Sequence, residues 1–235
     1  MNDELRFKLE QAHRIAHMEG LAEDASRGHI TARKEDGRVY IKPWGVGFEE
    51  VCAQDFQEVD QDGSLVEGTG RIHSELILHL EIYRKRKDVF SIAHVHPYYA
   101  ILLSAVFKGK MQVVSQHGVR FAGKIPFYPS AELIHSKEQG VKLAKTLGDQ
   151  PVVLMKNHGI TAVGASIEEA VILGIHFEQA AKEHLTATSF GRPQPMPQAV
   201  AKKLSANNYS PAQLRMLWEY YWKKFQKEQG PGAGG

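Results

Sequence analysis

Apolar positions along the chain follow two spacings, one typical of helices and one typical of strands. Residues 3–23 place apolar side chains every three or four positions among charged ones, which predicts an amphipathic helix. The same spacing predicts further helices over residues 74–87, 97–107, 136–148, 166–187 and 211–227. Pro97 favours a helix start, and Ser166 with Glu169 has the spacing of a capping box.

Short apolar runs between turn residues predict the strands, and Asp62-Gly63 predicts a hairpin. These strands cover residues 30–33, 38–43, 55–60, 64–68, 90–96, 111–116, 119–123 and 151–157. Helices and strands alternate with several hairpins, which favours a single three-layer α/β/α domain on a central, largely antiparallel sheet. We expect this domain to extend over residues 1–229 and the Gly-rich residues 230–235 to form a disordered tail.

Composition narrows the class of protein. The 235 residues are 43% apolar, which excludes an intrinsically disordered chain. The net charge is +2, and the chain has no basic stripe interleaved with aromatic residues, so nucleic acid is not an expected partner. The longest apolar stretch, around residues 98–107, is too short to span a bilayer, and the N-terminus lacks the pattern of a signal peptide. With a single cysteine, Cys52, we expect a cytoplasmic protein.

Two histidines at alternate positions, His94 and His96, end the strand predicted over residues 90–96. Alternate residues of a strand point to the same face, so both imidazoles are expected to project together. Two imidazoles at this spacing can chelate a borderline divalent cation such as Zn²⁺, Mn²⁺ or Fe²⁺. The alternative is a pair of hydrogen-bonded strand histidines, and for this motif alone the alternative is the more common case.

Two further residues have the chemistry that such a cation would use. His158 follows a predicted strand and precedes Gly159, which permits a tight turn, so we expect the imidazole to be exposed to a cleft. An ordinary solvated turn histidine is the alternative. Glu75 begins a predicted helix, where the helix dipole alone favours a carboxylate; beside a metal it would act as a general acid/base or as a movable ligand. Three imidazoles leave coordination positions open, which is typical of a catalytic site.

Taken in order, the segments HSELILHLEIYRKRKDV, AHVHPYYA, LMKNHGI and SIEEAV resemble the class II aldolase/adducin family over about residues 10–190. The resemblance implies that His94, His96 and His158 correspond to the family's three metal-binding histidines and Glu75 to its acid/base glutamate. It also implies an α/β/α domain that assembles as a homotetramer with active sites at subunit interfaces. Adducin-type members lack the metal site; this chain retains all four residues, which favours an enzyme.

The chain departs from the sugar-phosphate aldolases of this family where they bind phosphate. Their GN[IVL]S segment is Gly28-His29-Ile30-Thr31 here, and their Ser-Ser pair is His73-Ser74. The two imidazoles change the geometry of this pocket. An imidazole can carry a positive charge near neutral pH, so we expect His29, His73 and Ser74 to orient a carboxylate.

Two aromatic positions complete the candidate site. The proton-donating tyrosine of those aldolases falls at Phe127, or at Tyr128 if the alignment shifts by one residue. The family's C-terminal tyrosine, which closes over the neighbouring subunit's site, corresponds to Tyr220 or Tyr221. Residues 125–149 are similar to the branch that decarboxylates hydroxylated aromatic or pyridine carboxylates.

The sequence therefore predicts a metal-dependent carbon–carbon lyase that holds one divalent ion (Mn²⁺, Zn²⁺, Fe²⁺ or Co²⁺) and acts on a small carboxylated molecule. The favoured reaction is decarboxylation of a hydroxylated aromatic or pyridine (di)carboxylate, in which the metal stabilises enolate-like charge. An aldolase or epimerase acting on a sugar phosphate is the first alternative, and a non-catalytic adducin-like scaffold is the second.

Overall fold

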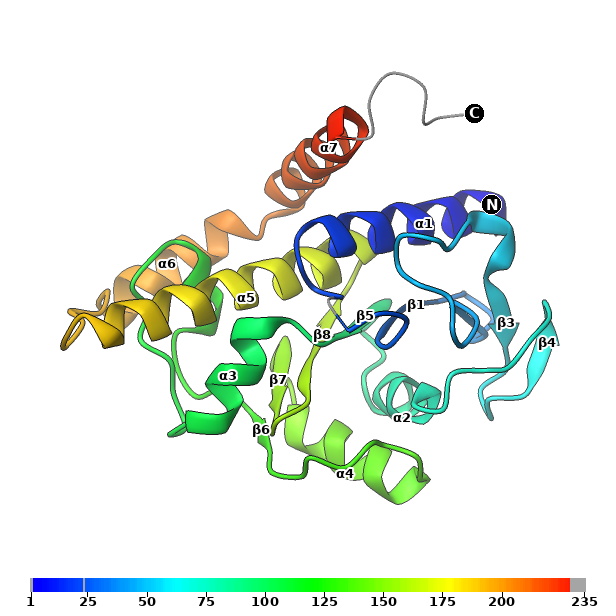
Figure 1. The fold of residues 1–235 in the computed structure, drawn as a ribbon, viewed down its shortest axis with the longest axis horizontal. Coiled ribbons are helices and arrows are strands. Elements are labelled where there is room, and N and C mark those ends of the chain that lie inside the picture. The colour runs from blue at the N-terminus through cyan, green and yellow to red at the C-terminus, as the bar shows by residue number, and fades with distance from the viewer. Residues whose placement is uncertain (1, 23, 229–235) are drawn as a thin grey trace.

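A twisted sheet runs through the middle of the computed structural model, which describes residues 2–22 and 24–228 (Figure 1). Within these residues the strand order is β4-β3-β2-β1-β5-β8-β7-β6. The strands are β1 (His29–Arg33), β2 (Val39–Ile41), β3 (Gln57–Val59), β4 (Leu65–Glu67), β5 (Ser91–Val95), β6 (Phe127–Tyr128), β7 (Val152–Met155) and β8 (Gly159–Gly164). Neighbouring strands pair antiparallel except β6 with β7, which pair parallel.

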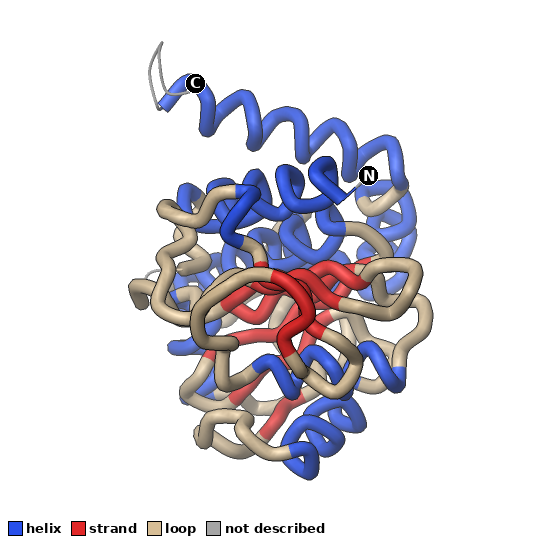
Figure 2. Tube along the Cα trace, turned by 90° about the vertical axis from the view of Figure 1, so that its right-hand side faces the viewer, coloured by secondary structure: helices blue, strands red, loops and turns tan. Residues whose placement is uncertain are grey.

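Helices cover both faces of the sheet (Figures 1 and 2). The helices are α1 (Asn2–Met18), α2 (Leu76–Lys85), α3 (Tyr98–Val106), α4 (Lys137–Leu147), α5 (Ile167–Ser189), α6 (Gln198–Asn208) and α7 (Pro211–Glu228). One apolar core joins α1, α3 and α5 to the sheet, and a second joins α2 and α4 to the opposite face. The predicted three-layer α/β/α class with a largely antiparallel sheet is confirmed.

The alternation of side chains along β5 decides which face carries the candidate chemistry. Ala93 and Val95 belong to the core under α1, α3 and α5, whereas Ile92 belongs to the core under α2 and α4. His94 has the same parity as Ile92, so its imidazole lies on the α2 and α4 face. Helix α2 begins next to this end of β5 and can therefore place Glu75 beside it.

The strands predicted over residues 111–116 and 119–123 are wrong. Residues 111–116 have no regular secondary structure, and His117–Phe121 form a 3₁₀ helix, η2. Val113 and Val119 pack with Ala201 of α6 in a small separate cluster. Alternating apolar positions indicate that one side of a segment is buried, but they do not show that the segment is a strand. Here helix α6 covers the buried side.

Strand β8, strand β6 and helix α6 were not predicted, because β8 is rich in Gly and Ala, β6 is two residues long and α6 has few apolar positions. The predicted tail, residues 230–235, lies outside the described residues. The extent of the domain over residues 1–229 stays a prediction. None of the described helices is both long and apolar enough to cross a membrane.

His13 of α1 fastens this helix to the sheet. Its Nδ1–H donates to the Leu9 carbonyl oxygen at 2.7 Å, and its Nε2 accepts from the Ile30 N–H of β1 at 3.3 Å. The ring also packs edge-on against Phe48, with 4.6 Å between ring centroids. Complete burial lowers the pKa of His13 to about 3, so the native chain holds this imidazole neutral.

We expect the free energy of unfolding to fall as the pH is lowered from 7 to 5. The unfolded chain binds a proton at His13 below its ordinary pKa of about 6.5, whereas the native chain does not until its own much lower pKa, so the contribution of this residue falls by about 2 kcal/mol over that range. Urea unfolding at both pH values measures it. In His13→Gln this part of the pH dependence should disappear, whereas His17→Gln, which replaces an exposed side chain of the same helix, should keep it. An equal pH dependence in the two variants would contradict the assignment.

Candidate metal centre

The four residues singled out by the sequence lie together at one end of β5. His94 is in the strand, His96 follows its last residue, His158 is in the turn between β7 and β8, and Glu75 is the residue before α2. One ligand atom from each can be chosen so that all four atoms lie within 4.8 Å of one another, and all four side chains are buried.

The protons on His94 and His96 are fixed from outside the cluster. The Nδ1–H of His94 donates to the Ile160 carbonyl oxygen at 3.1 Å, and that of His96 donates to the Asp24 carboxylate at 2.5 Å. A carbonyl or carboxylate oxygen can only accept, so each Nδ1 carries a proton, and in the neutral imidazole each Nε2 then carries the lone pair that a metal binds. The two Nε2 atoms are 3.1 Å apart. Two lone pairs at this distance repel each other, and a bound cation would relieve that repulsion.

Glu75 turns into the cluster and does not cap its helix. Its Oε1 accepts from the Ile134 N–H at 2.8 Å, and its Oε2 lies 3.7 Å from His94 Nε2 and 3.6 Å from His158 Nε2. Burial alone raises the pKa of Glu75, but its interactions with His158 and His94 outweigh burial and the net pKa is lowered. Glu75 is therefore ionised at neutral pH. The helix-dipole interpretation does not account for this position.

His158 is buried, whereas the sequence predicted an imidazole exposed to a cleft. Neither of its ring nitrogens has a hydrogen-bond partner within the described part of the chain. Its position depends on Gly159, because a Cβ there would lie 2.3 Å from the Val95 carbonyl oxygen and 2.9 Å from the His96 ring. A buried imidazole without partners is costly, and metal coordination would satisfy it.

These residues fit a divalent cation. Separations of 3.1 to 3.7 Å between neighbouring donor atoms are close to the edges, about 3.3–3.6 Å, of a tetrahedron with bonds of about 2.0–2.2 Å. Burial lowers the pKa of His94 to about 4, so this imidazole is neutral and able to bind a metal at pH 7. Three imidazoles and a carboxylate suit Zn²⁺, Mn²⁺, Fe²⁺ and Co²⁺.

The loop between α1 and β1 makes two hydrogen bonds to His96. Besides the Asp24 contact, the His96 backbone N–H donates to the Leu21 carbonyl oxygen at 3.2 Å. Ala25, next to Asp24, has a left-handed φ of 66°, which is strained for a residue with a Cβ. The sequence has no local signal for Asp24, since it lies 72 positions from its partner.

Lys42 is a second residue that the sequence did not indicate. It is fully buried, and its Nζ donates to the Ser26 and Val46 carbonyl oxygens, both at 2.7 Å. Burial lowers its pKa to about 8. The side chain thereby joins the Asp24 loop to the loop that follows β2.

His29 and His73 lie beside the metal centre, but the charge expected on them is wrong. His29 pairs with His94 across β1 and β5, and its ring centroid is 4.0 Å from that of His73. Burial is the largest cause that lowers the pKa of His73 to about 3, and the charge of Lys42 adds to it. Burial also lowers the pKa of His29 well below its ordinary value, with smaller contributions from the neighbouring histidines. Both imidazoles are neutral at pH 7, because removal from water penalises the imidazolium. Ser74 is exposed.

The aromatic candidates, Phe127, Tyr128 and Tyr220, lie on different faces of the sheet. Tyr128 is buried in the core under α2 and α4, on the face that carries His94, whereas Phe127 packs into the opposite core. The geometry therefore favours Tyr128 over Phe127 for the tyrosine position. Tyr220 is 60% exposed on α7, which contacts α1, α5 and α6 on the other side of the sheet. The structure does not bring Tyr220 to the centre of its own chain.

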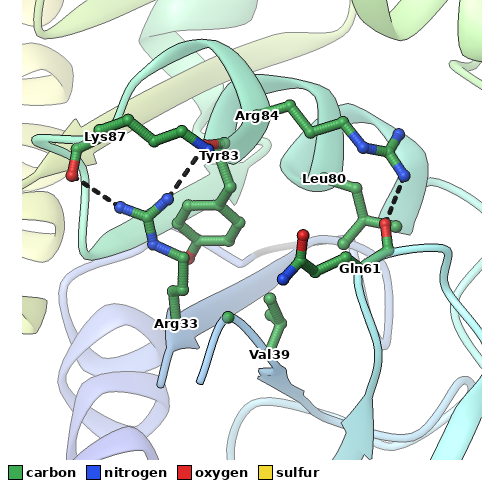
Figure 3. Close-up of a pocket in the computed structure, with 8 residues that line it drawn as sticks. Arg33, Val39, Gln61, Leu80, Tyr83, Arg84 and Lys87 are labelled. Atoms are coloured by element: carbon green, nitrogen blue, oxygen red, sulfur yellow. Dashed lines mark hydrogen bonds between the residues drawn. The ribbon is translucent and has the colours of Figure 1, made fainter. Parts of the chain in front are cut away.

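A small pocket of about 60 Å³ between α2 and the strands β1 and β2 contains several basic side chains (Figure 3). Arg33 donates to the carbonyl oxygens of Tyr83, Lys87 and Val89, and Arg84 donates to that of Gln61. These guanidinium groups already have partners, so the pocket is not a competing anion site.

We expect Asp24→Asn to weaken zinc binding by about 10- to 100-fold, because the amide no longer fixes the proton on His96 Nδ1 with a full negative charge. Competition with a chromogenic chelator measures the affinity, and circular dichroism checks the fold. Glu49→Gln is the matched control, since it removes a carboxylate that is exposed on the neighbouring loop. Equal zinc affinity in Asp24→Asn and wild-type protein would exclude the role.

The chain is similar in sequence to known proteins. The model of the Class II Aldolase and Adducin N-terminal domain matches residues 8–185. A 3,4-dihydroxyphthalate decarboxylase of Arthrobacter keyseri is 31% identical over 198 residues, which is 79% of each chain. The L-fuculose phosphate aldolase of Methanocaldococcus jannaschii is 31% identical over 159 residues, 67% of this chain and 83% of that one.

The fold has solved counterparts as well. An aldolase II superfamily protein from Pseudomonas syringae superposes with a TM-score of 0.86 at 25% identity, over 97% of this chain and 94% of that one. The chain therefore belongs to the class II aldolase and adducin family, and its buried glutamate and three histidines place it among the metal-dependent lyases of that family.

Proposed function

We propose that this enzyme decarboxylates a hydroxylated aromatic or pyridine carboxylate or dicarboxylate. Sequence identity alone does not choose the reaction, because the decarboxylase and the aldolase relatives are both 31% identical to the chain. The decarboxylase aligns over more of the chain, 79% against 67%. The choice depends on the residues beside the metal centre.

The neutral pair of imidazoles, His29 and His73, is the observation that carries the proposal. The two residues take the positions of the amide and hydroxyl that bind phosphate in the sugar-phosphate aldolases. A phosphate needs hydrogen-bond donors and positive charge. Neither buried imidazole carries charge. His29 already uses its N–H on His79, and His73 accepts the Glu75 N–H at Nδ1, so the pair offers one donor, the His73 Nε2–H. Their planar rings offer packing surface to an aromatic substrate.

Positive charge for the substrate carboxylate therefore has to come from the bound divalent ion and not from His29 or His73. Held by His94, His96 and His158, with Glu75 as a movable fourth ligand, this ion would supply Lewis-acid stabilisation of the negative charge that remains when CO₂ departs. The proposed site holds one such ion: Mn²⁺, Zn²⁺, Fe²⁺ or Co²⁺.

Glu75 would act first as a base, because its lowered pKa leaves it ionised at neutral pH. We propose that Glu75 removes the proton from the substrate hydroxyl next to the departing carboxylate. When the carbon–carbon bond breaks, the electron pair stays on the ring carbon and CO₂ leaves. Glu75 then returns the proton to that carbon, and a proton from water restores the hydroxyl of the product, so that H replaces CO₂ on the ring.

The assembly that we propose is a homotetramer. Tyr220 is exposed and lies across the sheet from its own centre, so it would reach the site of a neighbouring subunit. We further propose a cytoplasmic location, for which the single cysteine, Cys52, is suitable.

Product analysis of metal-loaded protein tests the reaction. We expect CO₂ release from at least one dihydroxybenzoate, dihydroxyphthalate or hydroxypyridine carboxylate, because the site offers neutral imidazoles and a base. Fuculose 1-phosphate and related ketose phosphates are assayed in parallel for aldehyde release. Efficient aldol cleavage without any CO₂ release would replace the proposal by the aldolase alternative. No turnover in either assay with fully metal-loaded protein would favour the scaffold alternative.

We expect Glu75→Gln to lower kcat by about 10²- to 10⁴-fold, because the amide keeps the size of the side chain but cannot accept or return a proton. Zinc content by mass spectrometry of the native protein should stay near one equivalent, since the three imidazoles remain. Glu81→Gln is the control, because it replaces a buried glutamate of α2 and leaves the carboxylate of Glu75 in place. Near wild-type kcat in Glu75→Gln would exclude the acid/base role.

A further inference from the structure

A chain of hydrogen bonds runs from His29 along the buried interface between β1 and α2 to the C-terminal end of α2. His29 Nδ1 is 2.7 Å from His79 Nε2, and His79 Nδ1 is 2.8 Å from Thr31 Oγ1. Thr31 Oγ1 is 2.8 Å from the Tyr83 hydroxyl, which in turn donates to the Phe90 carbonyl oxygen at 3.3 Å. All four side chains are buried.

The Phe90 carbonyl determines the direction of this chain. It can only accept, so Tyr83 gives it its one proton. Thr31 must then donate to Tyr83, and His79 Nδ1–H must donate to Thr31. His29 Nδ1–H donates last, to His79 Nε2. In the reverse direction Tyr83 would donate to Thr31 and could not donate to Phe90, so one direction alone makes every bond at once.

The far end of the chain is anchored firmly. Arg33 stacks over the Tyr83 ring at 5.1 Å and donates to the Tyr83 carbonyl oxygen, as Figure 3 shows. Burial raises the pKa of Tyr83, so the phenol keeps the proton that it donates. Burial also lowers the pKa of His79, which keeps the middle of the chain neutral.

The same direction leaves the second nitrogen of His29 without a proton. Nε2 is buried and has no partner among the described residues. The ring lies between two site residues, 4.0 Å from His73 and 5.3 Å from His94, measured between centroids. A buried acceptor without a donor costs free energy, and a ligand that brings a donor would recover it.

We propose that His29 Nε2 accepts a hydrogen bond from a hydroxyl group of the substrate, and that His79, Thr31 and Tyr83 are positioning residues that keep His29 in the accepting tautomer. The assignment rests on the proposed function, because it selects a hydroxylated substrate. Since Nε2 is covered, His73 has to turn aside when the substrate enters. The site then discriminates against a methoxy group or a phosphate dianion at this point, because neither brings a proton.

Nitrogen NMR of histidine-labelled, zinc-loaded protein tests the tautomer directly. We expect the Nδ1–H form of His29 in the wild-type protein and in Thr31→Ser, which keeps the hydroxyl. Thr31→Val removes the acceptor of His79, so His79 should turn its proton to Nε2 and His29 should change to the Nε2–H form. Tyr83→Phe should cause the same change and serves if Thr31→Val does not fold.

Binding of matched ligands tests the consequence. Wild-type protein and Thr31→Ser should bind a dihydroxybenzoate about tenfold more tightly than its mono-O-methyl ether, measured by calorimetry. Thr31→Val should lose that preference. The Nε2–H form in wild-type protein, or equal binding of the two ligands, would overturn the assignment even if CO₂ is released. Retained preference with no CO₂ release from any substrate would instead contradict the proposed function and support the role of His29.

Discussion

Two imidazole lone pairs that face each other at 3.1 Å are the constraint on which this site depends. Protons could relieve the repulsion, but the outer nitrogens of His94 and His96 already hold theirs, fixed by the Ile160 carbonyl and by Asp24. An imidazolium at His94 is disfavoured by complete burial. A divalent cation would satisfy both lone pairs, and the groups that orient these lone pairs, the Ile160 carbonyl and Asp24, would not themselves touch the metal.

Holding these groups requires backbone arrangements that ordinary residues do not tolerate. Gly159 lies so close to Val95 that a side chain would not fit, and Gly28 has a left-handed φ of 68° and would place a Cβ 3.0 Å from the His94 carbonyl oxygen. Ala25 adopts a similar φ at a cost. The buried Lys42 stabilises the loop that contains Ala25 by binding two carbonyl oxygens. Close approach of the α1–β1 loop and of the β7–β8 turn to β5 is thus what brings Asp24 and His158 to the strand that carries His94.

Patterns local in the sequence predicted the local part of this site well. The alternation in β5 determines that His94 and His96 share a face, and the order of helices and hairpins was sufficient for the fold class. The partners of these residues come from distant loops: Asp24 lies 72 positions from His96, and Ile134 lies 59 positions from Glu75. No periodicity reports such pairs. The strands expected over residues 111–123 fail for a related reason, because Val113 and Val119 are buried by a helix that the sequence did not indicate.

Charge was the property that the sequence could least reveal. A histidine near neutral pH can be an anion-binding cation or a neutral acceptor, and burial decides between them. For His29 and His73 burial removes the charge, and for His29 the hydrogen-bond chain to Tyr83 also decides which nitrogen accepts. The substitution of amide and hydroxyl by two imidazoles therefore does more than enlarge side chains. It replaces an amide and a hydroxyl by two uncharged rings, and one of them, His29, has a buried acceptor without a partner at Nε2 among the described residues. In the proposed site a hydroxylated ring would supply both the donor for this nitrogen and a flat apolar face.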